Sequence, residues 1–218
     1  DLSSAWCYVQ VADVLEQAGR EREALDWLER GRAAFGDDDS RLRGRLTAAY
    51  RRDGLDDEAL SVAWDHLLSR PTAAAVAELR DVCGEDGWPT HREDALATLK
   101  RDPGELVAAL VDDGDPAAAQ EVAERAQIGI GPRRKLARAL VRTDIGIALS
   151  QYDVLLEVAL EGTGERAYRD VTDLLREMHA AARVHGDGDV VVERAWAVRA
   201  AYLRRPKLVA GLDALGWW

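Results

Sequence analysis

The residues that could bind a metal or serve as nucleophiles are few and scattered along the chain. There are 4 histidines and 2 cysteines, and a zinc site needs several such ligands close together. His179 and His185 are six residues apart, so on one helix they point to different faces. The chain has no phosphate-binding loop of the Walker type and no nucleophile elbow. These patterns predict no metal site, no cofactor and no catalytic site.

A basic segment follows two glycines in the second half of the chain. Gly129-Ile130-Gly131-Pro132 precedes a predicted helix that begins with several cations, and the N-terminal end of a helix can bind anions. Pro132 also explains the segment as an ordinary helix start, and this alternative stays open. The candidate anion- or nucleic-acid-binding residues are Arg133, Arg134, Lys135, Arg138 and Arg142.

The elements that must position these residues are all predicted to be helices. Apolar residues recur at spacings of three and four along nearly the whole chain, and no stretch alternates with a period of two. A long turn is expected over 84–90, with the side chain of Trp88 packed into it. We also expect Trp27, Trp64 and Trp196 to lie in the core. The predicted helices are 4–18, 21–34, 40–53, 55–69, 72–84, 90–101, 104–113, 115–127, 132–142, 144–161, 164–185, 188–204 and 206–215.

The first two helix pairs repeat one pattern. Gly19 precedes Ala24-Leu25 as Gly54 precedes Ala59-Leu60, 35 residues further on. This period is close to the roughly 34 residues of tetratricopeptide repeats. The sequence therefore predicts an all-α fold of tetratricopeptide-like helical hairpins in an α-solenoid, a right-handed superhelix that is less regular toward the C-terminus. Its regular part would cover 1–102 and its degenerate part 103–218, with an irregular helical domain as the alternative.

In such a repeat the first helix of each hairpin would line a groove. An aromatic ring beside several arginines suits an acidic peptide with an apolar anchor, although ordinary solvated side chains explain the same residues. The partner-binding candidates are Trp6, Asp13, Glu16 and Gln17 from the first hairpin and Arg41, Arg51 and Arg52 from the second.

Composition narrows the possible partners. There are 40 acidic and 29 basic side chains, which give a formal net charge of −11. This balance argues against a chain that wraps nucleic acid or lies on an anionic membrane. No apolar run approaches the roughly 20 residues that span a bilayer. Two isolated cysteines do not form a disulfide framework and fit a cytoplasmic protein.

The order of the later segments resembles a known family. Trp88-Pro89-Thr90-His91-Arg92 is followed by a tyrosine-bearing helix around Tyr152, by the segment Ala167-Tyr168-Arg169 and by Arg204-Arg205-Pro206 with a closing helix. This order is similar to the C-terminal helical region of bacterial SWIM zinc-finger proteins. The resemblance implies a parent protein with an N-terminal zinc motif. The Cys-x-Cys and Cys-x-His pairs of that motif are absent from these 218 residues, so no zinc ligand carries over.

We therefore expect a non-catalytic protein-interaction or scaffolding module of a larger cytoplasmic protein, with a protein or peptide as its partner. The alternative is an accessory helical domain of a nucleic-acid-associated SWIM protein. Nucleic-acid contact would then run mainly through the part of the parent that lies outside these residues.

Overall fold

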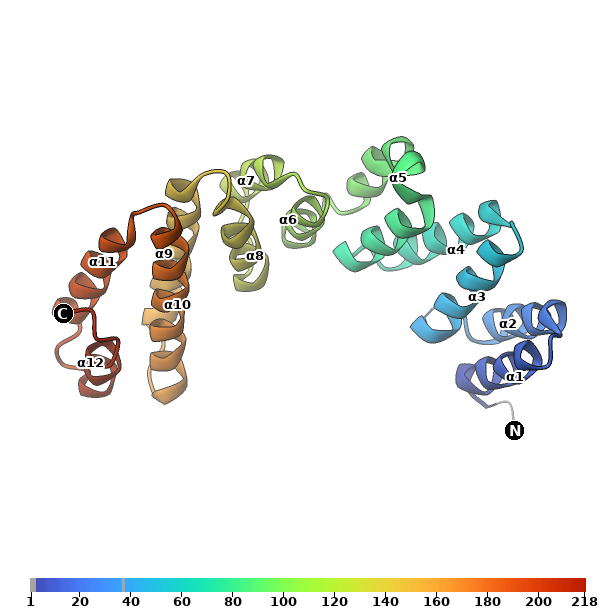
Figure 1. Ribbon diagram of the computed structural model, residues 1–218, viewed down its shortest axis with the longest axis horizontal. Helices are drawn as coiled ribbons and strands as arrows, with labels where there is room; N and C mark the ends of the chain where they lie inside the picture. The colour runs from blue at the N-terminus through green and yellow to red at the C-terminus, as the bar shows by residue number, and fades with distance from the viewer. Residues whose placement is uncertain (1–2, 37) are drawn as a thin grey trace. The chain divides into compact units, whose positions relative to one another are not determined.

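The computed structural model describes residues 3–36 and 38–218, and that part of the chain consists of twelve helices with no strand (Figure 1). The predicted all-α fold of helical hairpins is confirmed. The helices are α1 (Ala5–Gln17), α2 (Glu21–Phe35), α3 (Ser40–Arg52), α4 (Asp56–Ser69), α5 (Ala73–Thr98), α6 (Pro103–Asp112), α7 (Pro116–Arg125), α8 (Ile130–Leu140), α9 (Ile145–Glu161), α10 (Glu165–Val184), α11 (Gly188–Ala201) and α12 (Pro206–Asp213).

The helices form two compact units, Asp1–Ala109 and Leu110–Trp218. The division falls inside α6, whereas the sequence places the change of regularity after residue 102, just before this helix begins. Each unit has its own apolar core.

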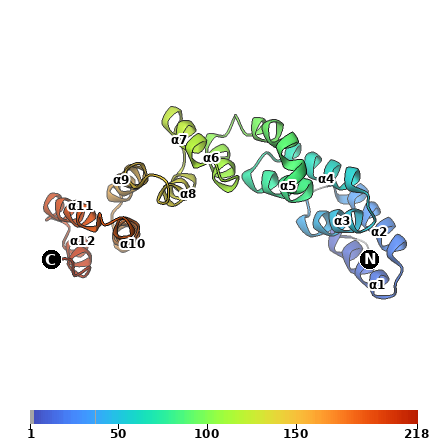
Figure 2. The same cartoon turned by 45° about the horizontal axis from the view of Figure 1, so that its top comes forward.

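In the first unit, α1 packs on α2, α2 on α3, α3 on α4 and α4 on α5, and α1 also contacts α3 (Figure 2). Gly19 and Gly54 have φ of 72° and 73°, a backbone conformation that favours glycine and ends the preceding helix. Alanines and leucines such as Ala24 and Leu28 are fully buried between the helices. As the sequence predicts, the repeated glycine ends the first helix of each hairpin, and the small residue after it packs between the helices.

The long turn expected over 84–90 is instead a kink within α5. Gly84 has φ 67° and ψ 175°, and helical structure resumes directly after it. Pro89 lies inside the helical part that follows this kink, where proline removes one backbone hydrogen bond. Trp88, only 6% exposed, is therefore buried from a helix and not from a loop.

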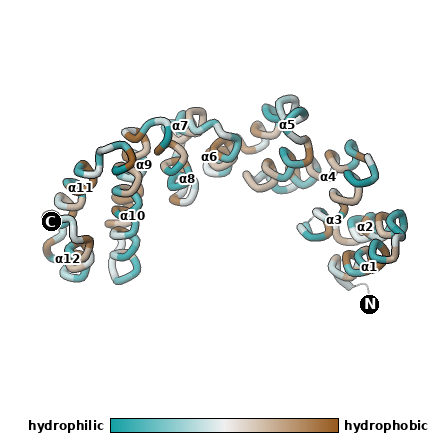
Figure 3. Tube along the Cα trace, viewed as in Figure 1, coloured by the Kyte–Doolittle hydropathy of each residue, from teal (hydrophilic) through white to brown (hydrophobic). Residues whose placement is uncertain are grey.

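In the second unit, α8 packs on α9, α9 on α10, and α10 on both α11 and α12. The core gathers apolar residues of α9 and α10, including Leu156, Leu175 and Met178. Apolar and polar residues alternate along each helix in the hydropathy view, as expected for helices with one buried face (Figure 3).

Not every tryptophan lies where the sequence pattern suggests. Trp27 and Trp64 are half-buried. Trp196 is 46% exposed, so its placement in the core is wrong. Its ring lies 5.0 Å from that of Trp218 and beneath the guanidinium of Arg199. The neighbouring helices therefore do not cover all of the apolar residues on α11, and Trp196 is one of those left exposed.

No helix among the described residues combines the length and the apolarity that crossing a membrane requires.

Two glycines of the first unit give opposite stability predictions. A Cβ on Gly31 of α2 would lie 3.0 Å from both Leu42 Cδ1 and Tyr8 Cβ, so α1, α2 and α3 meet there without room for a side chain. We expect Gly31→Leu to lower the urea-unfolding free energy by about 1–3 kcal/mol through overpacking. Gly44 of α3 has nothing within 4 Å, so Gly44→Ala should raise it by about 0.5–1 kcal/mol. Equal effects of the two substitutions would contradict this packing.

Candidate functional site

Most of the predicted groove residues of the first unit pair within the protein, two of them with Arg45, which the sequence did not point to. Arg45 of α3 donates to Asp13 (2.5 Å) and to Glu16 of α1, and Glu16 also accepts from Arg52 (2.9 Å). The guanidinium of Arg41 lies 5.2 Å from the ring centre of Trp6. The structure thus brings α1 and α3 together through these side chains. Gln17 is exposed.

Arg51, from the same predicted set, lines a cavity of about 330 Å³ between α3 and α5. Its Nη1 donates to the carbonyl oxygen of Asp81 over 3.4 Å. Deeper in the wall, the buried Arg43 donates to Glu78 through Nε (2.7 Å) and Nη2 (3.0 Å). This cavity therefore carries mixed charge, and its deepest cation is already held by a carboxylate.

The basic cluster of the second unit is also largely paired. Arg133 donates to Gln151 over 2.5 Å, and Lys135 donates to Asp112 over 2.5 Å. Arg134 and Arg138 both donate to Glu177 of α10. Arg142 is exposed. An anion at this cluster would have to compete with carboxylates for most of the cations, which weakens the prediction of an anion site.

Glu177 is the point at which three helices of the second unit meet. Its carboxylate accepts from Arg134 Nε (2.9 Å) and Arg138 Nε (2.7 Å) of α8 and from Tyr152 Oη (2.8 Å) of α9. Burial raises the pKa of Glu177, but the hydrogen bonds from Arg138, Arg134 and Tyr152 outweigh it and lower the pKa to about 2. Burial, followed by the bond to Glu177, raises the pKa of Tyr152. We call these four side chains the Glu177 cluster.

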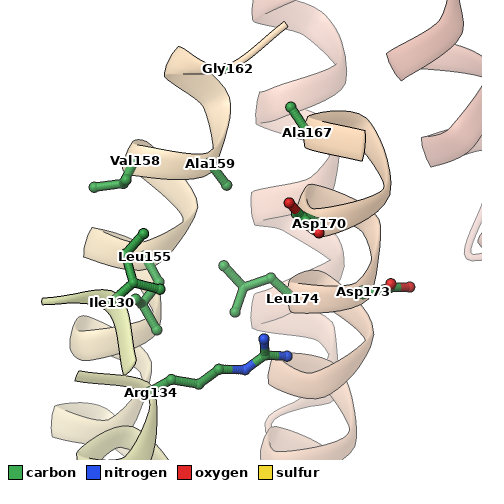
Figure 4. Close-up of a pocket in the computed structure, with 10 residues that line it drawn as sticks. All are labelled: Ile130, Arg134, Leu155, Val158, Ala159, Gly162, Ala167, Asp170, Asp173 and Leu174. Carbon is green, nitrogen blue, oxygen red and sulfur yellow. The ribbon is translucent and has the colours of Figure 1, made fainter. Parts of the chain in front are cut away.

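Beside the Glu177 cluster lies a cleft of about 450 Å³ (Figure 4). Its floor and one wall come from α9, the other wall from α10, and the first turn of α8 closes one side. Leu174 of α10 faces Leu155 and Ala159 of α9 across the gap (Figure 4). The residues that line the cleft are Ile130, Arg134, Leu155, Val158, Ala159, Gly162, Ala167, Asp170, Asp173 and Leu174.

The far end of the cleft is closed where α9 turns into α10. A Cβ on Gly162 would lie 2.8 Å from the Cβ of Ala167, so only glycine allows the end of α9 to approach the start of α10 this closely. The cleft is thus bounded by a tight backbone contact at the turn and by the Glu177 cluster at the other end. Between these two ends its walls are mainly apolar.

The sequence patterns do not point to this cleft. Arg134 is the one predicted site residue among those that line it. A usable signal was Ile130, an apolar residue between two glycines at a helix start, which proves 60% exposed. The glycines Gly162 and Gly164 mark the turn correctly, but no local pattern shows that the helices on either side leave a gap.

Comparison with known proteins adds little to this geometry. No protein-family model and no curated protein matches the chain. Among solved structures, it is similar to a kinesin-light-chain-like protein of Podospora anserina that has nearly identical tetratricopeptide-like repeats, with 16% identity over 97% of this chain and 95% of that one, at a TM-score of 0.38. A similarity at this level says nothing about the cleft.

The low pKa of Glu177 makes the stability of the second unit depend on pH. Because the pKa is lower in the folded state than the ordinary 4.5, the stabilisation is present above pH 4.5 and is lost as the pH falls toward 2. We expect wild type to lose on the order of 2 kcal/mol more than Glu177→Gln over this range. Urea unfolding at pH 6 and pH 3 measures the difference, and parallel losses in the two proteins would contradict the assigned bonds.

Proposed function

We propose that this chain is a non-catalytic protein-interaction module that holds a segment of a partner protein in the cleft between α8, α9 and α10. The main support for the proposal is that apolar side chains lining this cleft are exposed to solvent. Ile130 is 60% exposed and Val158 is 41% exposed, and the buried Leu155 and Leu174 face each other across the same cleft. Covering such a surface is favourable, and exposed apolar patches next to polar rims mark contact sites.

The chemistry of the cleft supports binding in preference to catalysis. The pKa of Glu177 is lowered to about 2, so this carboxylate stays ionised near neutral pH and is a poor proton acceptor. Arg134 is already engaged by Glu177. Apart from Arg134, the side chains that line the cleft are aliphatic or are carboxylates at its edge, a composition suited to holding an apolar side chain.

The resemblance to the C-terminal helical region of SWIM zinc-finger proteins supports a wider form of the proposal. In that form the module belongs to a larger cytoplasmic protein, and any nucleic-acid contact runs through the zinc-bearing part of the parent. The pairing of Arg133, Arg134, Lys135 and Arg138 within the second unit agrees with this division of roles.

The test is a selection of peptides on the full 218-residue chain from a random 12-residue library displayed on phage. Peptides that bind the cleft should lose affinity by about tenfold or more with Ile130→Asp, because an apolar contact becomes charged. Val184→Asp is the matched control, since Val184 is 79% exposed and does not line the cleft. Fluorescence anisotropy measures the affinities. Selected peptides that bind Ile130→Asp as tightly as wild type would contradict the proposal.

A further inference from the structure

We infer that the cleft between α8, α9 and α10 carries opposite charges at its two ends and binds its partner segment in one orientation. The segment would place a basic residue at the α9–α10 turn, apolar residues in the middle and an acidic residue beside the Glu177 cluster. This inference rests on the proposed function and adds the chemistry of the partner and its orientation.

The negative end of the cleft is Asp170. Its carboxylate lies on the α10 wall and faces the gap, whereas Asp173 points away from it (Figure 4). Asp173 is paired with Arg176 over 2.7 Å. Asp170 is exposed, and no ion pair engages it within the part of the chain that the structure describes. Asp170 therefore offers an uncompensated negative charge at the rim.

A cation of the protein also reaches this end but is committed to backbone. Arg205 Nη1 donates to the carbonyl oxygens of Leu160 (2.8 Å) and Gly162 (3.1 Å). These carbonyls lie at the C-terminal end of α9, where the helix dipole is negative. Arg205 offsets that partial charge and, in the described part of the chain, makes no ion pair with Asp170. The carboxylate of Asp170 can therefore pair with a basic residue of a ligand.

The positive end is the Glu177 cluster. Two guanidinium groups, those of Arg134 and Arg138, share the single carboxylate of Glu177. One net positive charge therefore remains at this end. The side chain of Arg138 is 61% exposed, so this charge is accessible to an acidic residue of the partner.

The two ends together set the direction of binding. A segment in the opposite orientation would place its acidic residue against Asp170 and its basic residue against the two arginines, and both contacts would be repulsive. Each favourable contact is exposed and therefore modest in energy. The apolar middle provides most of the affinity, and the charges select the orientation.

The experiment uses the peptides selected on the full chain. They are expected to carry Lys or Arg on one side of the apolar residues and Asp or Glu on the other. Asp170→Asn and Arg138→Gln should each weaken the tightest synthetic peptide by about three- to fivefold, and Arg138→Lys, which keeps the positive charge, should weaken it less than Arg138→Gln. Asp173→Asn is the matched control and should change affinity by less than about twofold, because this carboxylate points away and already has a partner.

A peptide with its basic and acidic residues exchanged provides a second readout. It should bind wild type more weakly than the original, by at least the larger of the two single effects. Circular dichroism confirms that the variants remain folded.

The outcomes separate this inference from the proposed function. Peptides that require Ile130 but respond equally to Asp170→Asn and Asp173→Asn, or tolerate the exchange of their charges, would overturn the polar cleft and leave the binding function standing. Peptides that do not require Ile130, or a library that yields none, would overturn both.

Discussion

One carboxylate ties together the helices that form the candidate site. Glu177 projects from α10 and accepts hydrogen bonds from two arginines of α8 and from Tyr152 of α9. In a helical repeat each helix contacts mainly its sequence neighbours, and here α8 packs on α9 and α9 packs on α10. The Glu177 cluster is a direct link from α8 to α10 across α9. It therefore ties α8 to α10 beside the cleft.

A specific contact lies at each end of the cleft. At one end the charged hydrogen bonds of Glu177 hold α8 against α10, and bonds of this kind are stronger than neutral ones. At the other end Gly162 lets the backbone of α9 approach Ala167. An unfilled space forgoes packing energy, which a partner side chain could recover.

The helices and their turns could be predicted from the sequence because they depend on local rules. Apolar spacing and the glycines at 19 and 54 are visible within one hairpin. The side-chain pairs could not be predicted, because their members lie far apart in the chain: Glu16 and Arg52 are 36 residues apart, and Arg134 and Glu177 are 43 apart. Residues assigned to a groove, such as Asp13 and Arg52, pair within the protein for this reason. The kink at Gly84 and the exposure of Trp196 likewise follow from how neighbouring helices pack.

Hydrogen–deuterium exchange of the full chain, with and without the tightest selected peptide, tests most directly whether the partner segment lies between α8, α9 and α10. We expect slower exchange in the first turns of α8, the second half of α9 and the first half of α10, with α1 to α4 unchanged. Protection confined to α3 and α5, along the cavity that contains Arg51, would contradict this expectation and would place the binding surface in the first unit.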